Sequence, residues 1–431
     1  MNIGKKVKIY VMALLLLAAS VLSAEGTERL SLDRAVRIAL ERNLDVLSAR
    51  TEREKGEGAL LSARSGLYPS LAVDASSTRR EDTGSAPARA DGAAITLSQT
   101  LYVGGTLRAG ERQALVGLKK AEQELEYAKE SVTKAVCESW FDLLQKEADM
   151  RTAEEAVAYY TTSWMDIKKR VELGLSTRLE LARADQQRVN AGAELIGAKN
   201  GLAKAKVSLL TLLRIDPTTE VEIDGRLETV AVEGDAKRSL EKALSTRPDL
   251  QALVSEEEAQ KEAVAIAAGG MKPTVKLSAS YRFNDTSSSL AADNANEWTA
   301  TLSVAVPVYD GGYAKGRVRS EKALQEQARQ STEKKRDAIG KETLNAWMTL
   351  VSTLETAEAA KQNVELAKES LRLAEVGYRE GVNTQLDVLQ ARTSLTEAQQ
   401  KLSSSLKEHN FAFVALRMAE GTLASVFEND R

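Results

Sequence analysis

The chain has 431 residues and a formal net charge of −3; 28% of its residues are charged and only 4% are aromatic. With six prolines and no serine- or glycine-rich linker, it is not expected to be a string of separate globular domains. Its composition is typical of long helices in contact with one another. The single cysteine, Cys137, and the single histidine, His409, lie far apart in helical segments, so no disulfide, metal site or nucleophilic catalytic pair is expected. Phosphate-binding and hydrolase motifs are also absent from the sequence, and we expect no enzymatic activity and no cofactor.

Residues 1–24 have the pattern of a secretory signal peptide. Three lysines precede an apolar run, residues 9–19, and two small residues, Ser23 and Ala24, end it. The alternative, an uncleaved anchor helix, would need about 20 apolar residues, and this run is shorter. Removing the three lysines leaves a net charge of about −6, so no nucleic-acid partner is expected. The sequence predicts a protein that leaves the cytoplasm.

Two short helices are predicted next. Ser31 is a suitable N-cap for the first, and Asn43 opens a second that runs to about Ser65. About 204 residues later the pattern returns, with Pro273 in the place of Pro69.

The sequence therefore indicates an internal duplication, with two copies of one unit. We place the first repeat at residues 25–226 and the second at residues 227–431. Beyond the loops the copies still match, since Trp347 stands in the place of Trp140.

Between each of these prolines and a later Gly-Gly pair, apolar and polar residues alternate with period two, which predicts strands. The four predicted strands form two hairpins, at about residues 70–80, 93–102, 274–283 and 299–306. Strands of roughly ten residues with one apolar face suit a membrane-spanning barrel, although a small soluble sheet packed on the helices would show the same pattern. Four strands cannot close a barrel and lipid does not tolerate open edges, so strands that span a membrane would require an oligomer.

Four long helices without proline are predicted, at about residues 106–172, 178–213, 313–379 and 385–417. The first and third would each be on the order of 100 Å long. On the second and fourth, small and apolar residues recur at spacings of three and four, as in coiled coils, and His409 lies on this stripe, where we expect a packing or pore-wall residue. A glycine, Gly174 or Gly381, interrupts each pair of helices before a Ser/Thr/Asn cluster. Each pair is thus predicted to be a helical hairpin with a tight tip.

Together, the signal peptide, the duplicated half, the strand hairpins and the glycine-centred tips resemble the TolC-like outer-membrane efflux and secretion channels. The resemblance covers essentially the whole mature chain, and its most specific part is residues 376–391, which read VGYREGVNTQLDVLQA. It implies a mainly helical fold with a membrane β-barrel part. A homotrimer in the lipid of the outer membrane would build a twelve-stranded barrel and a helical tunnel across the periplasm.

The resemblance also implies a gate at the periplasmic end of the tunnel. Tyr378 matches the tip tyrosine of the family and Asp387 the first aspartate of its constriction. Glu180 takes the place of an acidic partner in the first repeat. The sequence departs from the family at Gln390, where some members carry a second acidic ring, and at Asn383, where some carry a gating arginine. The alternative is that these are solvated residues at helix starts.

Four further residues match the positions where family members meet the hairpins of a periplasmic adaptor protein. They are Gly174, Leu175, Gly381 and Val382. The alternative is that the glycines only end the helices.

The resemblance thus implies the passive exit duct of a tripartite efflux pump, joined through an adaptor to an inner-membrane transporter. A type I protein-secretion duct would carry the same features. A coiled-coil interaction protein of the periplasm or cell surface is the alternative from another class.

Overall fold

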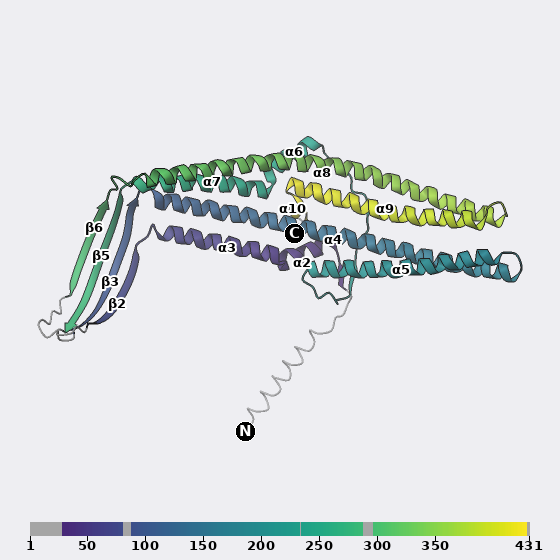
Figure 1. Ribbon diagram of the computed structural model, residues 1–431, viewed down its shortest axis with the longest axis horizontal. Coiled ribbons are helices and arrows are strands. Elements are labelled where there is room, and N and C mark those ends of the chain that lie inside the picture. The colour runs from purple at the N-terminus through teal and green to yellow at the C-terminus, as the bar shows by residue number, and fades with distance from the viewer. Residues whose placement is uncertain (1–27, 81–87, 233, 288–295, 429–431) are drawn as a thin grey trace, which may run out of the picture. The chain divides into compact units, whose positions relative to one another are not determined.

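The computed structural model describes residues 28–80, 88–232, 234–287 and 296–428 (Figure 1). The predicted signal peptide lies outside these residues. The chain divides into two compact units. We call one the tip unit, with the described residues of 28–43, 133–231 and 350–414, and the other the sheet unit, with the described residues of 44–132, 232–349 and 415–428. Each unit takes segments from both repeats.

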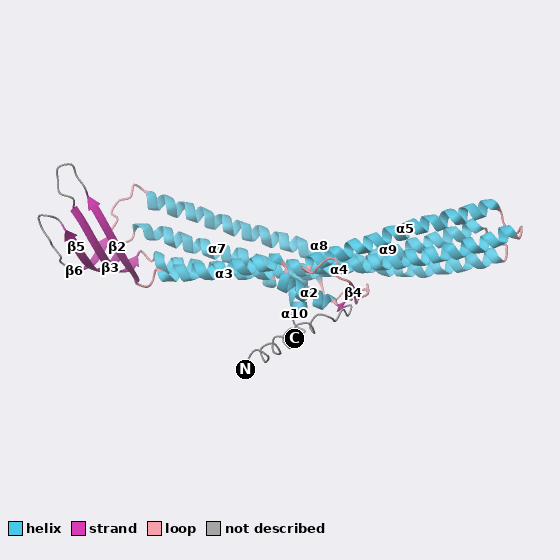
Figure 2. Ribbon diagram, turned by 90° about the horizontal axis from the view of Figure 1, so that it is seen from below, coloured by secondary structure: helices cyan, strands magenta, loops and turns pink. Residues whose placement is uncertain are grey.

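The sheet unit contains one antiparallel four-stranded sheet (Figure 2). Its strands, in the order β2-β3-β5-β6, are β2 (Ser70–Arg80), β3 (Ala88–Val103), β5 (Thr274–Ser287) and β6 (Glu297–Ala305). The pairing of β3 with β5 joins the two predicted hairpins into this single sheet. Within the described part of the chain, β2 and β6 are hydrogen-bonded on one side only. The sheet therefore has two open edges.

Large apolar side chains form a row across all four strands. Val73 pairs with Ile95, Ile95 with Tyr281, and Tyr281 with Trp298. All four are exposed, Trp298 most of all at 75%. This exposed apolar row has no packing partner among the residues that the structure describes, as expected for a face turned to lipid.

Two strands are longer than the sequence predicted. β3 begins at Ala88 rather than near residue 93, and β5 runs to Ser287 rather than residue 283. The added residues, 88–92 and 284–287, are mostly polar or small and show little apolar alternation. They are in strands because the backbones of β3 and β5 continue to pair as far as Arg89 and Ser287.

The tip unit holds two more strands that the sequence did not predict. β1 (Glu28–Leu30) pairs in parallel with β4 (Val221–Ile223). Three residues are too short a run to show a period of two, and the partners are about 190 residues apart, so only the tertiary structure reveals the pairing.

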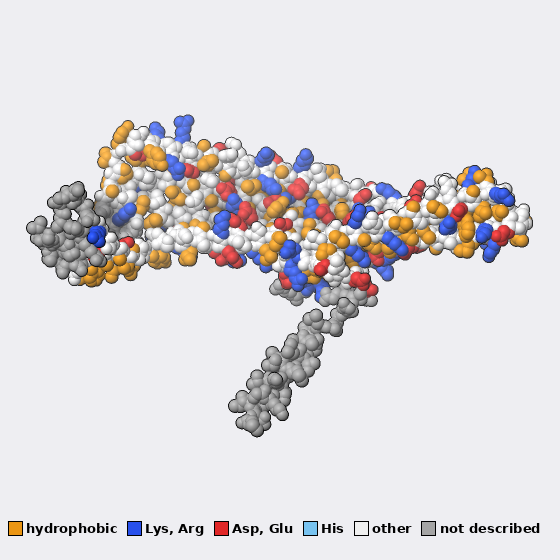
Figure 3. Space-filling model, turned by 60° about the horizontal axis from the view of Figure 1, so that its bottom comes forward, with side chains coloured by type: hydrophobic (Ala, Val, Ile, Leu, Met, Phe, Trp, Pro, Cys, Tyr) orange, Lys and Arg blue, Asp and Glu red, His pale blue; other side chains and the backbone are white. Residues whose placement is uncertain are grey.

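The long helices lie where the sequence predicted them. α4 (Thr106–Glu172) and α8 (Tyr313–Arg379) each contribute to both units, and α5 (Arg178–Leu212) and α9 (Gln385–Glu420) return from them. Among the described residues no helix is long and apolar enough to cross a membrane. Oppositely charged residues are interspersed over the helical surface (Figure 3), where many pair at i,i+3 or i,i+4 spacing, as Arg372 does with Glu369.

Shorter helices complete both units. They are α2 (Leu32–Arg42) and, in the sheet unit, α3 (Leu44–Ser65), α6 (Ala236–Thr246), α7 (Pro248–Ala268), the 3₁₀ turn η1 (Gly269–Met271) and α10 (Leu423–Glu428). Ser31 caps α2 as predicted, accepting a hydrogen bond from the backbone of Arg34.

The stripes of small and apolar residues pack together within the tip unit. One cluster joins α8 to α9 through Val364, Leu371, Leu395 and their neighbours. Alanines at the contact permit close approach of the two helices. This confirms the close packing of helices that the 3-4 spacing predicted.

His409 is fully buried on α9 and fixes a segment that we call the strap, residues 224–231. Its Nε2 lies 3.1 Å from the backbone nitrogen and 2.9 Å from the carbonyl oxygen of Val230. The next residue, Asn410, donates a hydrogen bond to the carbonyl oxygen of Glu228. His409 is thus a packing residue, and no group of His, Cys, Asp and Glu side chains in the described ranges is placed to hold a metal ion.

Candidate functional site at the hairpin tips

Both hairpins reverse direction through the same backbone motif. Gly174 and Gly381 have φ angles of 74° and 76°, a region that favours glycine. In the first tip the nitrogen of Leu175 donates to the carbonyl of Arg170, and in the second that of Val382 donates to Gly377. These are the backbone bonds of a Schellman motif, which ends a helix abruptly.

The two tips lie side by side (Figure 1). Nε2 of Gln385, at the start of α9, donates to the carbonyl oxygen of Glu180, at the start of α5, over 3.2 Å. A buried cluster of Ala156, Ala191 and Leu389 holds α4, α5 and α9 together nearby. The structure therefore brings the predicted site residues of both repeats to one place.

Glu180 and Asp387 occupy equivalent positions in the first turns of their helices. The Glu180 carboxylate accepts hydrogen bonds from the Ser176 hydroxyl and from the backbone of Thr177, which lower its pKa. Asp387 accepts from the hydroxyl and the backbone of Thr384, which likewise lower its pKa. Each carboxylate closes a capping box and stays ionised at neutral pH.

Tyr378 lies beside these residues and is half-buried. Burial raises the pKa of its hydroxyl, and the negative charge of Glu180 raises it further. The Arg170 guanidinium lies 5.4 Å from the centre of the Tyr378 ring, within range of a cation–π contact. Tyr378 is thus close to Glu180, although the hydrogen bonds of the Glu180 carboxylate go to its own N-cap.

The two positions that depart from the family differ in their surroundings. Asn383 folds back over Gly377 and donates to the carbonyl of Ala374 over 3.4 Å. A Cβ atom at Gly377 would lie 2.4 Å from Nδ2 of Asn383, so this arrangement requires glycine there. Gln390 is exposed on α9, one turn beyond Asp387.

Sequence reasoning missed a second tyrosine–carboxylate pair. The Tyr159 hydroxyl on α4 donates to Glu375 on α8 over 2.9 Å, and burial together with this bond raises the pKa of Tyr159. Arg392, on α9 and only 6% exposed, lies 4.7 Å from the centre of the Tyr159 ring. The one available signal was the Tyr159-Tyr160 pair in a sequence poor in aromatic residues.

A cavity of about 450 Å³ opens between α4, α8 and α9 at this level. Tyr159, Glu375, Tyr378 and Gln385 line it. Gln385 is 5% exposed, and its Oε1 has no hydrogen-bond partner in the described part of the chain. Of the predicted gate residues, Tyr378 lines this cavity, whose wall is part polar and part apolar.

Apolar side chains are exposed at both tips. Leu175 is 74% exposed and Val382 is 81% exposed, and Leu173, Leu179 and Leu386 are also exposed. Apolar residues gathered on a surface indicate a contact site.

The outer membrane efflux protein family model matches residues 35–213 and 239–422. The chain belongs to this family. This outer membrane efflux protein is 23% identical to the outer membrane protein TolC of Vibrio cholerae over 401 residues, which are 90% of this chain and 89% of that one. It is 22% identical to the outer membrane efflux protein BepC of Brucella suis, over 98% of this chain and 92% of that one.

The fold is that of solved outer-membrane channels. The Campylobacter jejuni CmeC outer membrane channel superposes with a TM-score of 0.81 at 18% identity, covering 90% of this chain and 85% of that one. This efflux protein therefore has the fold of the outer-membrane channels, and its place is the outer membrane. The family is one of transport ducts and not of enzymes. Membership of this family also argues against the alternative from the sequence analysis, a coiled-coil interaction protein.

Proposed function

We propose that this efflux protein is the passive exit duct of a tripartite pump. An inner-membrane transporter would supply the energy, and a periplasmic adaptor would join it to the duct. The observation that carries the proposal is the open four-stranded sheet, whose edge strands β2 and β6 are unpaired on one side within the described residues. Since lipid does not tolerate unpaired backbone groups, other copies of the chain have to close the sheet.

Membrane barrels begin at about eight strands, which two sheets of four would reach, but a barrel of about eight strands is only wide enough to be filled by its own side chains. Three sheets of four give about twelve strands and a wider interior, which suits a duct. The apolar row that includes Val73 and Trp298 would then face lipid. The homotrimer is thus the assembly that we propose.

The predicted gate follows from threefold symmetry. Asp387 is exposed and ionised, so three copies around a narrow pore would form a ring of carboxylates that binds cations. Gln390 in place of a second acid would make this block weaker than two rings would. Tyr378 and Tyr159, which link or border α4 and α8, would hold the tip helices in the closed position.

The adaptor is proposed to meet the tips at Gly174, Leu175, Gly381 and Val382. The support is the exposure of Leu175 and Val382 and the absence of side chains on the two glycines, which permits close backbone approach.

Single-channel recording in planar bilayers tests the gate. Asp387→Asn should reduce the block of current by divalent cations by about tenfold, since it removes the ring's charge while an amide can still cap α9. Glu397→Gln, an exposed acid on the same helix, is the matched control and should leave the block unchanged. Unaltered divalent block in Asp387→Asn would refute the ring, and a protein that forms no channel at all would refute the duct.

A further inference from the structure

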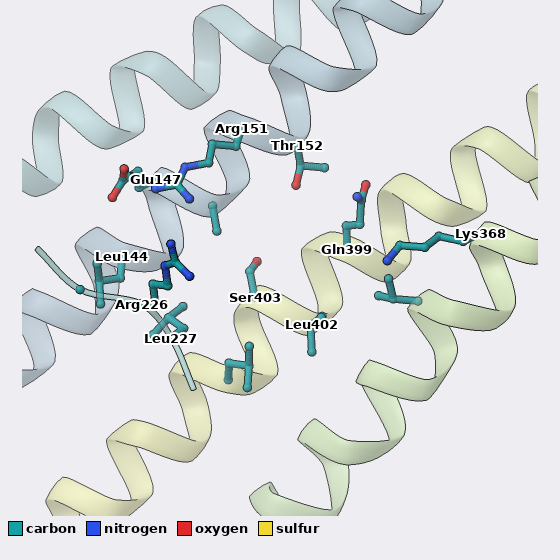
Figure 4. Close-up of a pocket in the computed structure, with 14 residues that line it drawn as sticks. Leu144, Glu147, Arg151, Thr152, Arg226, Leu227, Lys368, Gln399, Leu402 and Ser403 are labelled. Atoms are coloured by element: carbon teal, nitrogen blue, oxygen red, sulfur yellow. Dashed lines mark hydrogen bonds and ion pairs between the residues drawn. The ribbon is translucent and has the colours of Figure 1, made fainter. Parts of the chain in front are cut away.

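A second cavity lies in the tip unit at the edge of the strap, away from the predicted gate residues (Figure 4). Its volume is about 380 Å³, and it is lined by α4, α8, α9 and strap residues 225–227. This is the size range of sites for small organic ligands.

Three basic side chains from three separate segments line this cavity: Arg151 of α4, Arg226 of the strap and Lys368 of α8. Figure 4 shows Arg226 pointing towards Arg151, and Lys368 pointing towards Gln399 of α9. The lining contains one carboxylate, Glu147, and its Oε1 lies 2.6 Å from Nη2 of Arg151.

Arg226 is the cation of this group that makes no ion pair. Lys368 pairs with Glu365 over 2.7 Å, whereas Arg226 is exposed and has no ion-pair partner in the described ranges of the chain. Two guanidinium groups that face each other beside one carboxylate leave a local excess of positive charge, which favours an anion.

The rest of the lining has a polar part, Thr152, Gln399 and Ser403, and an apolar part. Leucines from α4, the strap and α9 form the apolar part, namely Leu144, Leu227, Leu402 and Leu406, together with Val364. An inorganic anion would leave these side chains without a partner. An apolar body that carries one anionic group would satisfy both the cations and the leucines.

The strap is held in place without a ligand. His409 and Asn410 bond its backbone at Val230 and Glu228. At Gly225 a Cβ atom would lie 3.3 Å from Nε1 of Trp140, so the strap runs close against α4. The cavity is therefore preformed, which lowers the entropic cost of binding.

We propose that this cavity binds a small organic anion, an apolar molecule with a single carboxylate or sulfonate group. Arg226 would make the charge-assisted contact, with Lys368 and Arg151 around it. The proposal concerns a site separate from the tip gate and holds whether or not the protein acts as a pump duct.

Binding of 4-phenylbutyrate to the purified full-length protein in a neutral detergent, measured by isothermal titration calorimetry, tests the proposal. The acid should bind more tightly than its neutral analogue 4-phenylbutanol. Arg226→Gln and Lys368→Gln should each weaken the acid about tenfold and leave the alcohol unchanged. The matched control is Arg372→Gln, one turn from Lys368 and in the same i,i+3 pairing, but outside the cavity lining.

Three results would overturn the proposal. Equal binding of acid and alcohol would show a merely apolar crevice, and equal weakening by Arg372→Gln would show a general charge effect. Competition by inorganic phosphate at the affinity of the acid would show a site for simple anions instead. Circular dichroism of the variants separates loss of binding from loss of fold.

Discussion

The carboxylates of Glu180 and Asp387 cap the N-termini of their own helices, whether or not they also line a pore. Each accepts two hydrogen bonds at the start of its helix, and the pKa of each is lowered by them. A carboxylate of this kind keeps its charge down to acid pH, because protonation would forfeit the cap. The local role and the proposed gating role are therefore compatible, since the same bonds that cap α9 keep Asp387 negative.

Gly377 and Asn383 form a coupled pair at the second tip. Alanine is favoured over glycine in a helix by about 1 kcal/mol, but a Cβ at Gly377 would displace the Asn383 amide. We expect Gly377→Ala to stabilise the tip by about 1 kcal/mol only in an Asn383→Ala background. Hydrogen exchange of the tip, read by mass spectrometry, measures this, and an equal gain in both backgrounds would contradict it.

A buried ionic network in the sheet unit makes stability depend on pH. Arg247 is 3% exposed and makes two bonds to Asp249, at 3.0 and 2.7 Å, and one to Glu342. Burial alone would raise the pKa of Asp249, but hydrogen bonds from Arg247 and Lys335 outweigh it and lower the pKa.

Because the folded-state pKa of Asp249 is lowered, its stabilisation is complete above its unfolded pKa of about 3.9 and is lost as pH falls through the folded value. We expect the melting temperature to fall on acidification below about pH 4, and this part of the fall to be missing in Asp249→Asn. Glu333→Gln, which breaks an exposed pair with Arg336, is the control and should follow the wild type. Identical profiles for wild type and Asp249→Asn would contradict the assignment.

At the scale of elements, a hydrogen bond between two side chains joins the first hairpin to the second, in addition to the Gln385–Glu180 bond at the tips. The Tyr159 hydroxyl joins α4 to Glu375 on α8. Hydrogen bonds to charged groups contribute about 1.5–3 kcal/mol, so losing this one should ease separation of the helices.

Tyr159→Phe should therefore raise the opening rate of the tip segments of α4 and α8 about tenfold in hydrogen exchange. In single-channel recording it should also increase the time spent open. Tyr160→Phe is the neighbouring control, because that ring is buried and its hydroxyl has no hydrogen-bond partner in the part of the chain that is described. A larger effect at Tyr160 than at Tyr159 would rule out the link.

At the scale of the whole molecule, assembly depends on the edge strands β2 and β6, which are paired on one side only within the described residues. If copies close the sheet, β2 of one chain lies beside β6 of the next. With Cys137→Ser as background, a cysteine at Val73 combined in turn with cysteines along β6 should give covalent trimers on oxidation in membranes, visible on denaturing gels. Cysteines at Leu97 of β3 and Ala279 of β5, which pair within the chain, should give monomers only. Monomers from every edge combination would exclude closure between these strands.

Sequence alone determined most of the elements and the fold class of this protein. Helical periodicity, caps and the duplicated pattern are local signals, and they predicted the long helices, the Ser31 cap and the two glycine tips, all of which the structure confirms. The residues 376–391 were specific enough to indicate the family, which the family match confirms. The tip residues came together as predicted, although their roles as gate and adaptor contacts remain proposals.

Tertiary structure alone decided the contacts between distant segments. The pairing of β1 with β4, the extension of β3 along β5, the Tyr159–Glu375 bond and the cavity under the strap all join residues far apart in the chain. Periodicity tells which face of an element is apolar but not which partner covers it, because many pairings satisfy the same pattern. The choice among them is made by packing, hydrogen bonding and burial acting together, and those exist only once the chain has folded.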